Sequence, residues 1–148
     1  MTDQAAFYRR AEEWLYRLME LNPVLATQLG DHRWDDQLGD NSPEAVESQY
    51  QEILAALDEF RAMDTPGFDL DTQIDHILVV QLLDSFVRRY ERHQSHRRNP
   101  SGYLDEALGG VFLLLMKEFA PLPNRLRSAL GRVREVPRVL AEAEQNIA

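Results

Sequence analysis

Apolar residues recur at helical spacing along almost the whole chain. In the first segment they are separated by steps of four and three positions: Phe7, Ala11, Trp14, Leu18 and Leu21. This spacing places them on one side of an α-helix. No stretch alternates apolar and polar residues over more than a few positions, and the sequence has no Asn-Gly or Asp-Gly turn. We therefore expect an all-α fold.

The helix start and stop signals predict one domain over residues 1–148, an array of about six to seven helices. A long helix is predicted from Asp69 or Asp71 to about Arg98, and apolar residues cover most of its circumference, which favours a central position. Its end carries several arginines, as the helix dipole favours. The last helix keeps its apolar stripe in phase through Pro137, so we expect a kink there.

Two short motifs are expected to shape the connections. Asn22-Pro23 can cap a short second helix that ends at Gly30, a residue suited to the left-handed conformation. Gly109-Gly110 allows either a sharp bend or a close approach of two backbones.

Composition excludes several classes of protein. There are 25 acidic and 16 basic residues, a formal charge of -9, which disfavours nucleic acid and anionic lipid as partners. Without cysteine the chain can form neither disulfides nor thiolate metal sites, which fits a cytoplasmic location. The longest apolar run, from Val111 to Met116, is far shorter than the ~20 residues that span a bilayer. We expect no membrane and no nucleic-acid partner.

The connection "NPVLATQLGDHRWDDQLGDNSPE", residues 22–44, is the main candidate region. In a structural interpretation Trp34 is buried in the core, Asp31 binds local amides, as do Asp40 or Asn41, and Arg33 pairs with a carboxylate. In a functional interpretation Asp31, His32 and Trp34 line a substrate groove.

No complete catalytic motif is present. The chain lacks His-Glu-x-x-His, Gly-x-Ser-x-Gly and a glycine-rich phosphate loop, so we assign no catalytic residue, no metal ligand and no cofactor to it. His93 and His96 have the spacing of two ligands on one helix face. The arginines beside them oppose a cation, so a basic helix end is the preferred interpretation over a small metal-dependent enzyme or an RNA-binding patch.

The ordered motifs resemble a known bacterial family. Residues 22–36, NPVLATQLGDHRWDD, resemble the amino-terminal signature of the family called domain of unknown function 885. The resemblance continues through Gln73-Ile74-Asp75, Asn99-Pro100 with Tyr103, Ala120-Pro121 with Arg125-Leu126, and Val136-Pro137.

The resemblance implies a role for the chain. Members of that family are large all-helical proteins whose later part carries a zinc metallopeptidase-like His-Glu-x-x-His motif. The resemblance implies that this chain is the non-catalytic N-terminal helical scaffold of such a protein and is inactive alone. Its partner would be the remainder of the parent polypeptide. Zinc would be bound by the parent protein and not by this chain. The final helix has no stop signal, so we expect a fragment of a longer chain, able to form a homodimer. The alternative is a helical protein-protein interaction module without enzymatic activity.

Overall fold

The computed structural model describes residues 4–147, and this part of the chain is helical with no β-strand. Its helices are α1 (Gln4–Leu21), α2 (Pro23–Leu29), α3 (Pro43–Arg61), α4 (Leu70–Arg88), α5 (Ser95–Arg98), α6 (Pro100–Leu104), α7 (Gly110–Met116) and α8 (Leu122–Asn146). A π-helical turn, η1 (Arg89–His93), continues α4, and a second, η2 (Asp105–Gly109), joins α6 to α7. Residues 4–147 thus form seven uninterrupted helices, which confirms the predicted all-α array.

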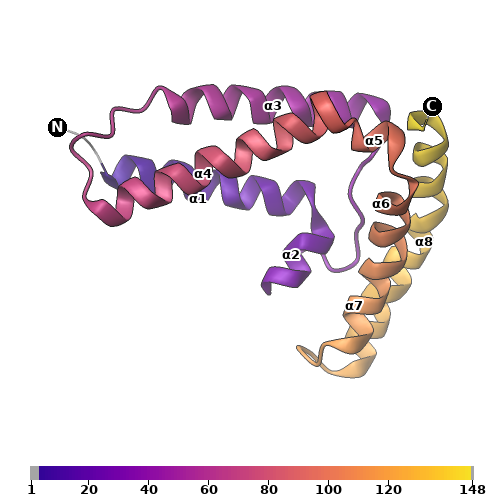
Figure 1. Ribbon diagram of the computed structural model, residues 1–148. Coiled ribbons are helices and arrows are strands. Elements are labelled where there is room, and N and C mark those ends of the chain that lie inside the picture. The colour runs from indigo at the N-terminus through magenta and orange to yellow at the C-terminus, as the bar shows by residue number, and fades with distance from the viewer. Residues whose placement is uncertain (1–3, 148) are drawn as a thin grey trace.

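The helices form two arms. In one arm α1, α3 and α4 lie alongside one another, and in the other α6, η2 and α7 run antiparallel to α8 (Figure 1). Helix α2 and the loop of residues 30–42 lie where the arms meet.

Each arm has its own apolar core. The core of the first contains mainly large side chains: Phe7, Ala56, Leu57, Phe60, Phe68, Leu83 and Val87. The core of the second is smaller and joins the loop to α6, η2 and α8: Leu38, Tyr103, Ala107, Val139 and Ala143. Because Leu38 belongs to the second core, the loop connects the two arms by packing as well as by chain continuity.

Side-chain caps define several helix ends. Ser42 Oγ accepts from the Ala45 amide at the start of α3 (3.2 Å), and Asp69 Oδ1 accepts from the Thr72 amide at the start of α4 (2.8 Å). Gly30 closes α2 in the predicted left-handed conformation, with φ 92°. Asn22 precedes α2 as predicted, but its side chain does not cap the helix. Its side-chain Nδ2 instead donates to Leu18 O of α1.

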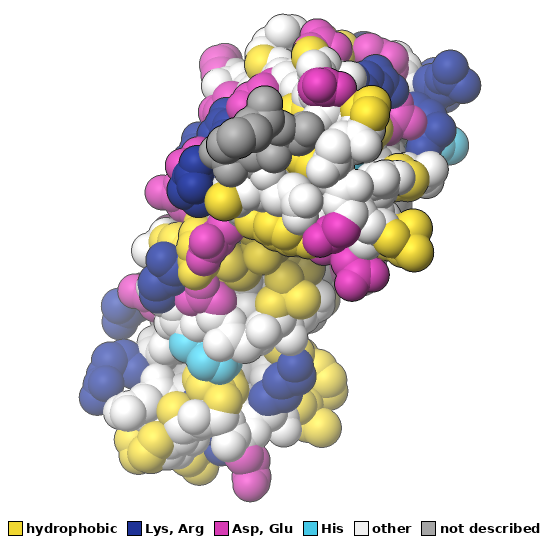
Figure 2. All heavy atoms as spheres, turned by 90° about the vertical axis from the view of Figure 1, so that its left-hand side faces the viewer, with side chains coloured by type: hydrophobic (Ala, Val, Ile, Leu, Met, Phe, Trp, Pro, Cys, Tyr) yellow, Lys and Arg dark blue, Asp and Glu magenta, His cyan; other side chains and the backbone are white. Residues whose placement is uncertain are grey.

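The long helix differs from its prediction in two ways. It ends at His93, because Gln94 adopts a left-handed conformation with φ 50°. His93 and His96 therefore lie on separate helices, and the predicted shared helix face is wrong. The helix is also not central, since Ile77 and Leu78 are 54% and 60% exposed. Figure 2 shows hydrophobic side chains gathered in a band across the middle of the molecular surface.

The second arm contains the Gly109-Gly110 motif and Pro137, and both lie within helices. The helix passes through Gly109-Gly110 without a break, and Gly110 permits close packing: a Cβ there would lie 2.8 Å from Val24 Cγ2. Helix α8 continues through Pro137 without a loop, and the kink expected there stays a prediction. None of the helices in residues 4–147 is long and apolar enough to cross a membrane.

Helix α8 turns an unexpected face inward. Its buried residues include the charged and amide side chains of Arg125, Arg132, Glu142 and Asn146, beside Ala129, Val139 and Ala143. The leucine stripe that marks the helix in the sequence faces outward, with Leu126 and Leu130 44% and 57% exposed. The loop of residues 30–42 supplies partners for Arg132, Glu142 and Asn146, whereas Arg125 donates to carbonyl oxygens of residues 114–120.

Candidate functional site

The first turn of the loop is held by an ion pair. The Arg33 amide donates to Asp31 Oδ1, and the Arg33 Nε is 3.0 Å from both carboxylate oxygens. The hydrogen bonds from Arg33 lower the pKa of Asp31. The guanidinium carbon lies 4.3 Å from the centre of the Trp34 ring and 5.0 Å from that of Tyr16. The predicted pairing of Arg33 with a carboxylate is confirmed.

Trp34 does not anchor the loop. It is half-buried and covered by the Arg33 guanidinium, so the prediction that it is buried in the core is wrong. The buried side chains of the loop are those of Asp35 and Leu38, and these residues are 6% and 5% exposed. Leu38 supplies the apolar anchor, and Asp35 is a buried carboxylate that requires partners.

His32 is oriented by that carboxylate. Its Nδ1 lies 3.0 Å from Asp35 Oδ2, while Thr27 Oγ1 lies 2.7 Å from Asp35 Oδ1. A carboxylate only accepts hydrogen bonds, so this contact places a proton on His32 Nδ1. The imidazole also stacks on Phe119, with ring centres 3.8 Å apart and an interplanar angle of 10°. The ring is fixed on two sides, and its side chain remains 34% exposed.

A buried arginine is hydrogen-bonded to Thr27, the residue that contacts Asp35 of the His32–Asp35 pair. Arg132 is 0% exposed, and its Nη2 donates to Thr27 Oγ1 (2.7 Å). Its other N–H groups donate to the carbonyl oxygens of Gln37, Gly110 and Pro23. A chain of hydrogen bonds therefore runs from α8 through α2 to Asp35 and His32. Burial lowers the pKa of Arg132, although the charge of Asp35 acts in the opposite direction.

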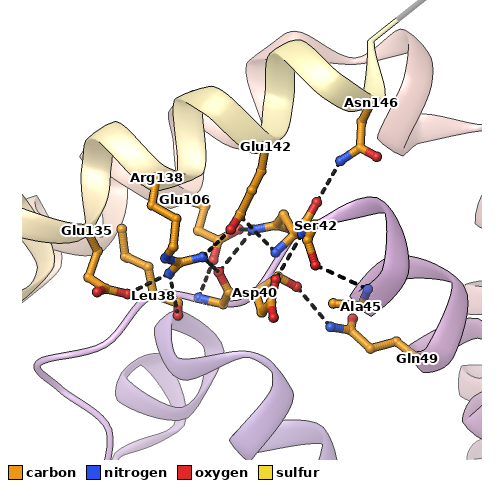
Figure 3. Close-up of polar contacts among 12 residues, drawn as sticks. Leu38, Asp40, Ser42, Ala45, Gln49, Glu106, Glu135, Arg138, Glu142 and Asn146 are labelled. Atoms are coloured by element: carbon orange, nitrogen blue, oxygen red, sulfur yellow. Dashed lines mark hydrogen bonds and ion pairs between the residues drawn. The ribbon is translucent and has the colours of Figure 1, made fainter.

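A second network fixes the far end of the loop (Figure 3). Glu106 Oε1 accepts from the Gly39 amide (2.7 Å), and its Oε2 accepts from Asn41 Nδ2 (2.9 Å). Burial raises the pKa of Glu106. Glu142 Oε2 accepts from the Asn41 amide, and Asn146 Nδ2 donates to the Asn41 carbonyl. These contacts give residues 39–41 a structural role.

Arg138 completes that network. It pairs with Glu142 and Glu135 on its own helix, and its Nη1 also donates to the Gly39 carbonyl (3.2 Å). The predicted local role of Asp40 is confirmed, because its Oδ1 accepts from the Ser42 amide (2.9 Å). That hydrogen bond lowers the pKa of Asp40.

The three predicted groove residues thus divide into two groups. Asp31 and Trp34 are joined through Arg33, whereas His32 is joined to Asp35 and Phe119. The latter arrangement gives the loop a positioned imidazole, a group that can accept or donate a proton.

The described residues do not fit a zinc site. Between residues 4 and 147, no three His, Asp or Glu side chains are grouped to hold a metal ion. His96 stacks on Tyr90, with ring centres 4.6 Å apart, and its pKa is lowered by burial and by Arg97. A catalytic zinc needs three protein ligands and an open position.

Comparison with known proteins places the chain in a wider context. Residues 23–148 match the family model described as bacterial protein of unknown function (DUF885). A solved structure described as a "putative lipoprotein of unknown function" from Shewanella oneidensis is similar, with a TM-score of 0.85 and 27% identity. The match covers 96% of this chain and 26% of that one, so the chain spans about a quarter of its relative's length. No functionally curated protein matches.

Proposed function

Because the chain belongs to the DUF885 family of bacterial proteins of unknown function, we propose that it is the N-terminal helical scaffold of a larger zinc-dependent, metallopeptidase-like hydrolase. In this role the chain carries no catalytic residue. It packs against the catalytic helices and forms one wall of the substrate cleft. The proposal combines the family membership with the many large apolar side chains exposed on the surface.

The outer face of the second arm is the observation that supports this role most strongly. Along η2, α7 and α8 a continuous series of large apolar residues is 44–63% exposed: Leu108, Phe112, Met116, Leu122, Leu126, Leu130 and Val133. Between them lies an apolar groove of about 460 Å³, lined by residues of η2, α7 and α8. Soluble monomers rarely expose a contiguous apolar surface of this kind, which marks an interface.

The length of the similar structure supports our choice of what covers this face. About three quarters of that chain lies outside the match, which leaves ample polypeptide to pack on a surface formed by only one quarter. We assign the outer face of α7 and α8 to helices of this remaining portion. The zinc ligands and the general base belong there as well, since the described residues do not supply them.

The loop of residues 30–36 is the part of the scaffold that reaches the cleft. Asp31, His32 and Trp34 lie on it, and His32 keeps an exposed imidazole whose orientation is fixed by Asp35 and Phe119. In the complete hydrolase these side chains contact substrate or its surrounding water, and the substrate itself is unknown. The cytoplasmic location stays a prediction.

The test compares two polypeptides. One is the 148-residue chain, and the other is the product of the reading frame continued beyond residue 148. We expect the longer product to contain His-Glu-x-x-His, to contain zinc when measured by elemental analysis, and to hydrolyse peptides of a library. The 148-residue chain alone should neither bind zinc nor hydrolyse peptides. Peptide hydrolysis by the 148-residue chain, or a longer product without zinc ligands, would contradict the proposal.

A non-enzymatic interaction module is the second candidate. It is favoured by the outward stripe of α8, where exposed Leu126 and Leu130 lie on the same helix as the exposed Arg127 and Arg134. In this case the stripe forms a homodimer. Light scattering would then give twice the mass of the chain, and Leu126→Asp would return it to the monomer.

A further inference from the structure

A second apolar groove lies on the other arm, between α1 and α4. Its volume is about 470 Å³, and its walls include Leu15 and Leu18 of α1 and Leu78 and Leu82 of α4. Phe7 and Leu83, which also line it, belong to the core of this arm and are 1% and 4% exposed. The groove is therefore an opening above a packed core.

The walls of this groove are poorly covered. Leu15, Leu78 and Leu82 are 47%, 60% and 46% exposed. Because Leu78 and Leu82 are one helical turn apart, the exposed positions run along the helix. This arrangement forms a lengthwise apolar channel.

The charged groups that line the channel all have one sign. Glu12 and Asp75 are its only ionisable acids or bases apart from Tyr8 within residues 4–147, and Tyr8 Oη donates to Asp75 Oδ2 (2.8 Å). This hydrogen bond fixes the position of the Asp75 carboxylate. An apolar channel with acidic edges complements apolar side chains accompanied by cations.

A helix fits the channel better than an extended strand does. Two parallel ridges of side chains form the groove into which a third helix packs. A helix satisfies its own backbone hydrogen bonds, whereas an extended segment would leave amides and carbonyls unpaired against the apolar walls.

A second copy of the chain does not suit the channel in a symmetric arrangement. In two copies joined groove to groove, Glu12 and Asp75 of each copy would meet no basic residue of the other groove lining, and each copy carries a formal charge of -9. Like charges across an interface are destabilising. The occupant therefore carries basic residues.

We propose that the groove between α1 and α4 binds an amphipathic helix with aliphatic residues on successive turns and Lys or Arg on its flanks. This inference rests on the proposed scaffold role, because the helix is assigned to the remainder of the longer polypeptide. It extends that role by defining a second interface and the chemistry of its partner.

Trp14 makes the proposal measurable in the 148-residue chain. It lines the groove, and the chain has two tryptophans, so Trp34→Phe leaves Trp14 as the sole indole. The probe is a synthetic helical peptide with leucines at positions i, i+4 and i+7 and lysines on both flanks. Its control has the same leucines and glutamates on the flanks. We expect the lysine peptide to change Trp14 emission and to bind at least about tenfold more tightly than the glutamate peptide.

Two substitutions test the site within the same titration. Leu82→Asp places a charge in the wall and should abolish binding. Leu70→Asp changes a residue of the same helix that is 70% exposed and outside the groove, so binding should persist. Glu12→Lys should narrow or reverse the preference between the two peptides. Circular dichroism establishes that each variant is folded.

Three results would overturn the proposal. One is no change in Trp14 emission with the lysine peptide, and another is equal affinity for both peptides. The third is a concentration-dependent assembly that Leu82→Asp abolishes, which would assign the groove to a second copy, for instance through α8. Since the titration needs neither zinc nor turnover, its failure is separate from a failure of the hydrolase proposal.

Discussion

Arg132 of α8 donates a 2.7 Å hydrogen bond to the Thr27 hydroxyl of α2, and the two side chains are 0% and 1% exposed. This contact joins segments 105 positions apart in the chain. The same hydroxyl lies 2.7 Å from Asp35, so the orientation of His32 depends on a residue of the last helix.

Removal of that arginine should be strongly destabilising. Arg132→Leu deletes donors to Thr27 and to three carbonyl groups, leaving buried acceptors without partners. We expect the free energy of unfolding to fall by about 3–5 kcal/mol, measured by urea denaturation. The matched control is Arg127→Leu on the exposed side of the same helix, which should change it by less than about 0.5 kcal/mol. Equal effects of the two substitutions would contradict the buried network.

Adjacent glycines should respond to alanine in opposite directions. At Gly110 a Cβ would lie 2.8 Å from Val24 Cγ2 and 3.2 Å from Leu38 Cδ2, so Gly110→Ala should destabilise by about 1–3 kcal/mol. At Gly109 nothing lies within 4 Å of the added Cβ, and the residue is helical. Gly109→Ala should therefore stabilise by about 0.5–1 kcal/mol. Thermal unfolding of both variants checks this, and the same sign for both would count against the packing of α7 on α2.

The protonation of the His32 ring tests the candidate site directly. With Asp35 as acceptor, neutral His32 should be protonated on Nδ1, which long-range ¹H–¹⁵N spectra distinguish from the usual Nε2 form. Asp35→Ala removes the acceptor and should shift the ring toward Nε2 protonation. His93 serves as an internal reference. An Nε2-protonated His32 in the unmodified chain would show that Asp35 does not orient the ring.

His96 should make stability depend on pH. Its pKa is lowered from 6.5, by burial first and then by Arg97. Below pH 6.5 the unfolded chain therefore binds the proton more readily than the folded chain, and the contribution of His96 to stability decreases as the pH falls toward its folded pKa. In His96→Gln this proton uptake is absent. The difference in unfolding free energy, unmodified chain minus variant, should decrease from pH 7.5 to pH 5.5; an increase would mean that the folded pKa is raised.

Most helix positions could be predicted from local signals. Ser42, Asp69 and Gly30 end or begin helices as their chemistry favours, because caps act through neighbouring amides and carbonyls. The early end of the long helix at Gln94 could not be predicted in this way, since a left-handed glutamine has no strong local signal.

The packing of α8 shows why the site was harder to predict. Two stripes of residues run along this helix. The one with the larger side chains, including Leu126 and Leu130, is the one that the sequence predicts to be buried, because leucine is usually buried. The buried stripe has small and polar residues at steps of four and three, including Ala129, Arg132 and Ala143. Arginine becomes favourable at a buried position only where other segments supply acceptors, and those acceptors are distant in sequence. The recurrence of Arg125, Ala129, Arg132, Val139 and Ala143 at helical spacing was the available signal.

The same reasoning applies to the loop. His32 could be selected as a candidate from its place beside acidic residues, whereas the supporting role of Asp35 depends on Thr27 and, through it, on Arg132. Phe119, which stacks on His32, follows α7 and is remote in the sequence.

Fragment complementation tests the scaffold role most directly. The 148-residue chain and the remainder of the longer polypeptide would be produced separately, mixed, and assayed for zinc-dependent peptide hydrolysis. We predict activity only in the mixture, and loss of activity when the folded variant Leu126→Asp/Leu130→Asp replaces the unmodified chain. Full activity of the remainder without the chain, or of the mixture with that variant, would contradict the scaffold role.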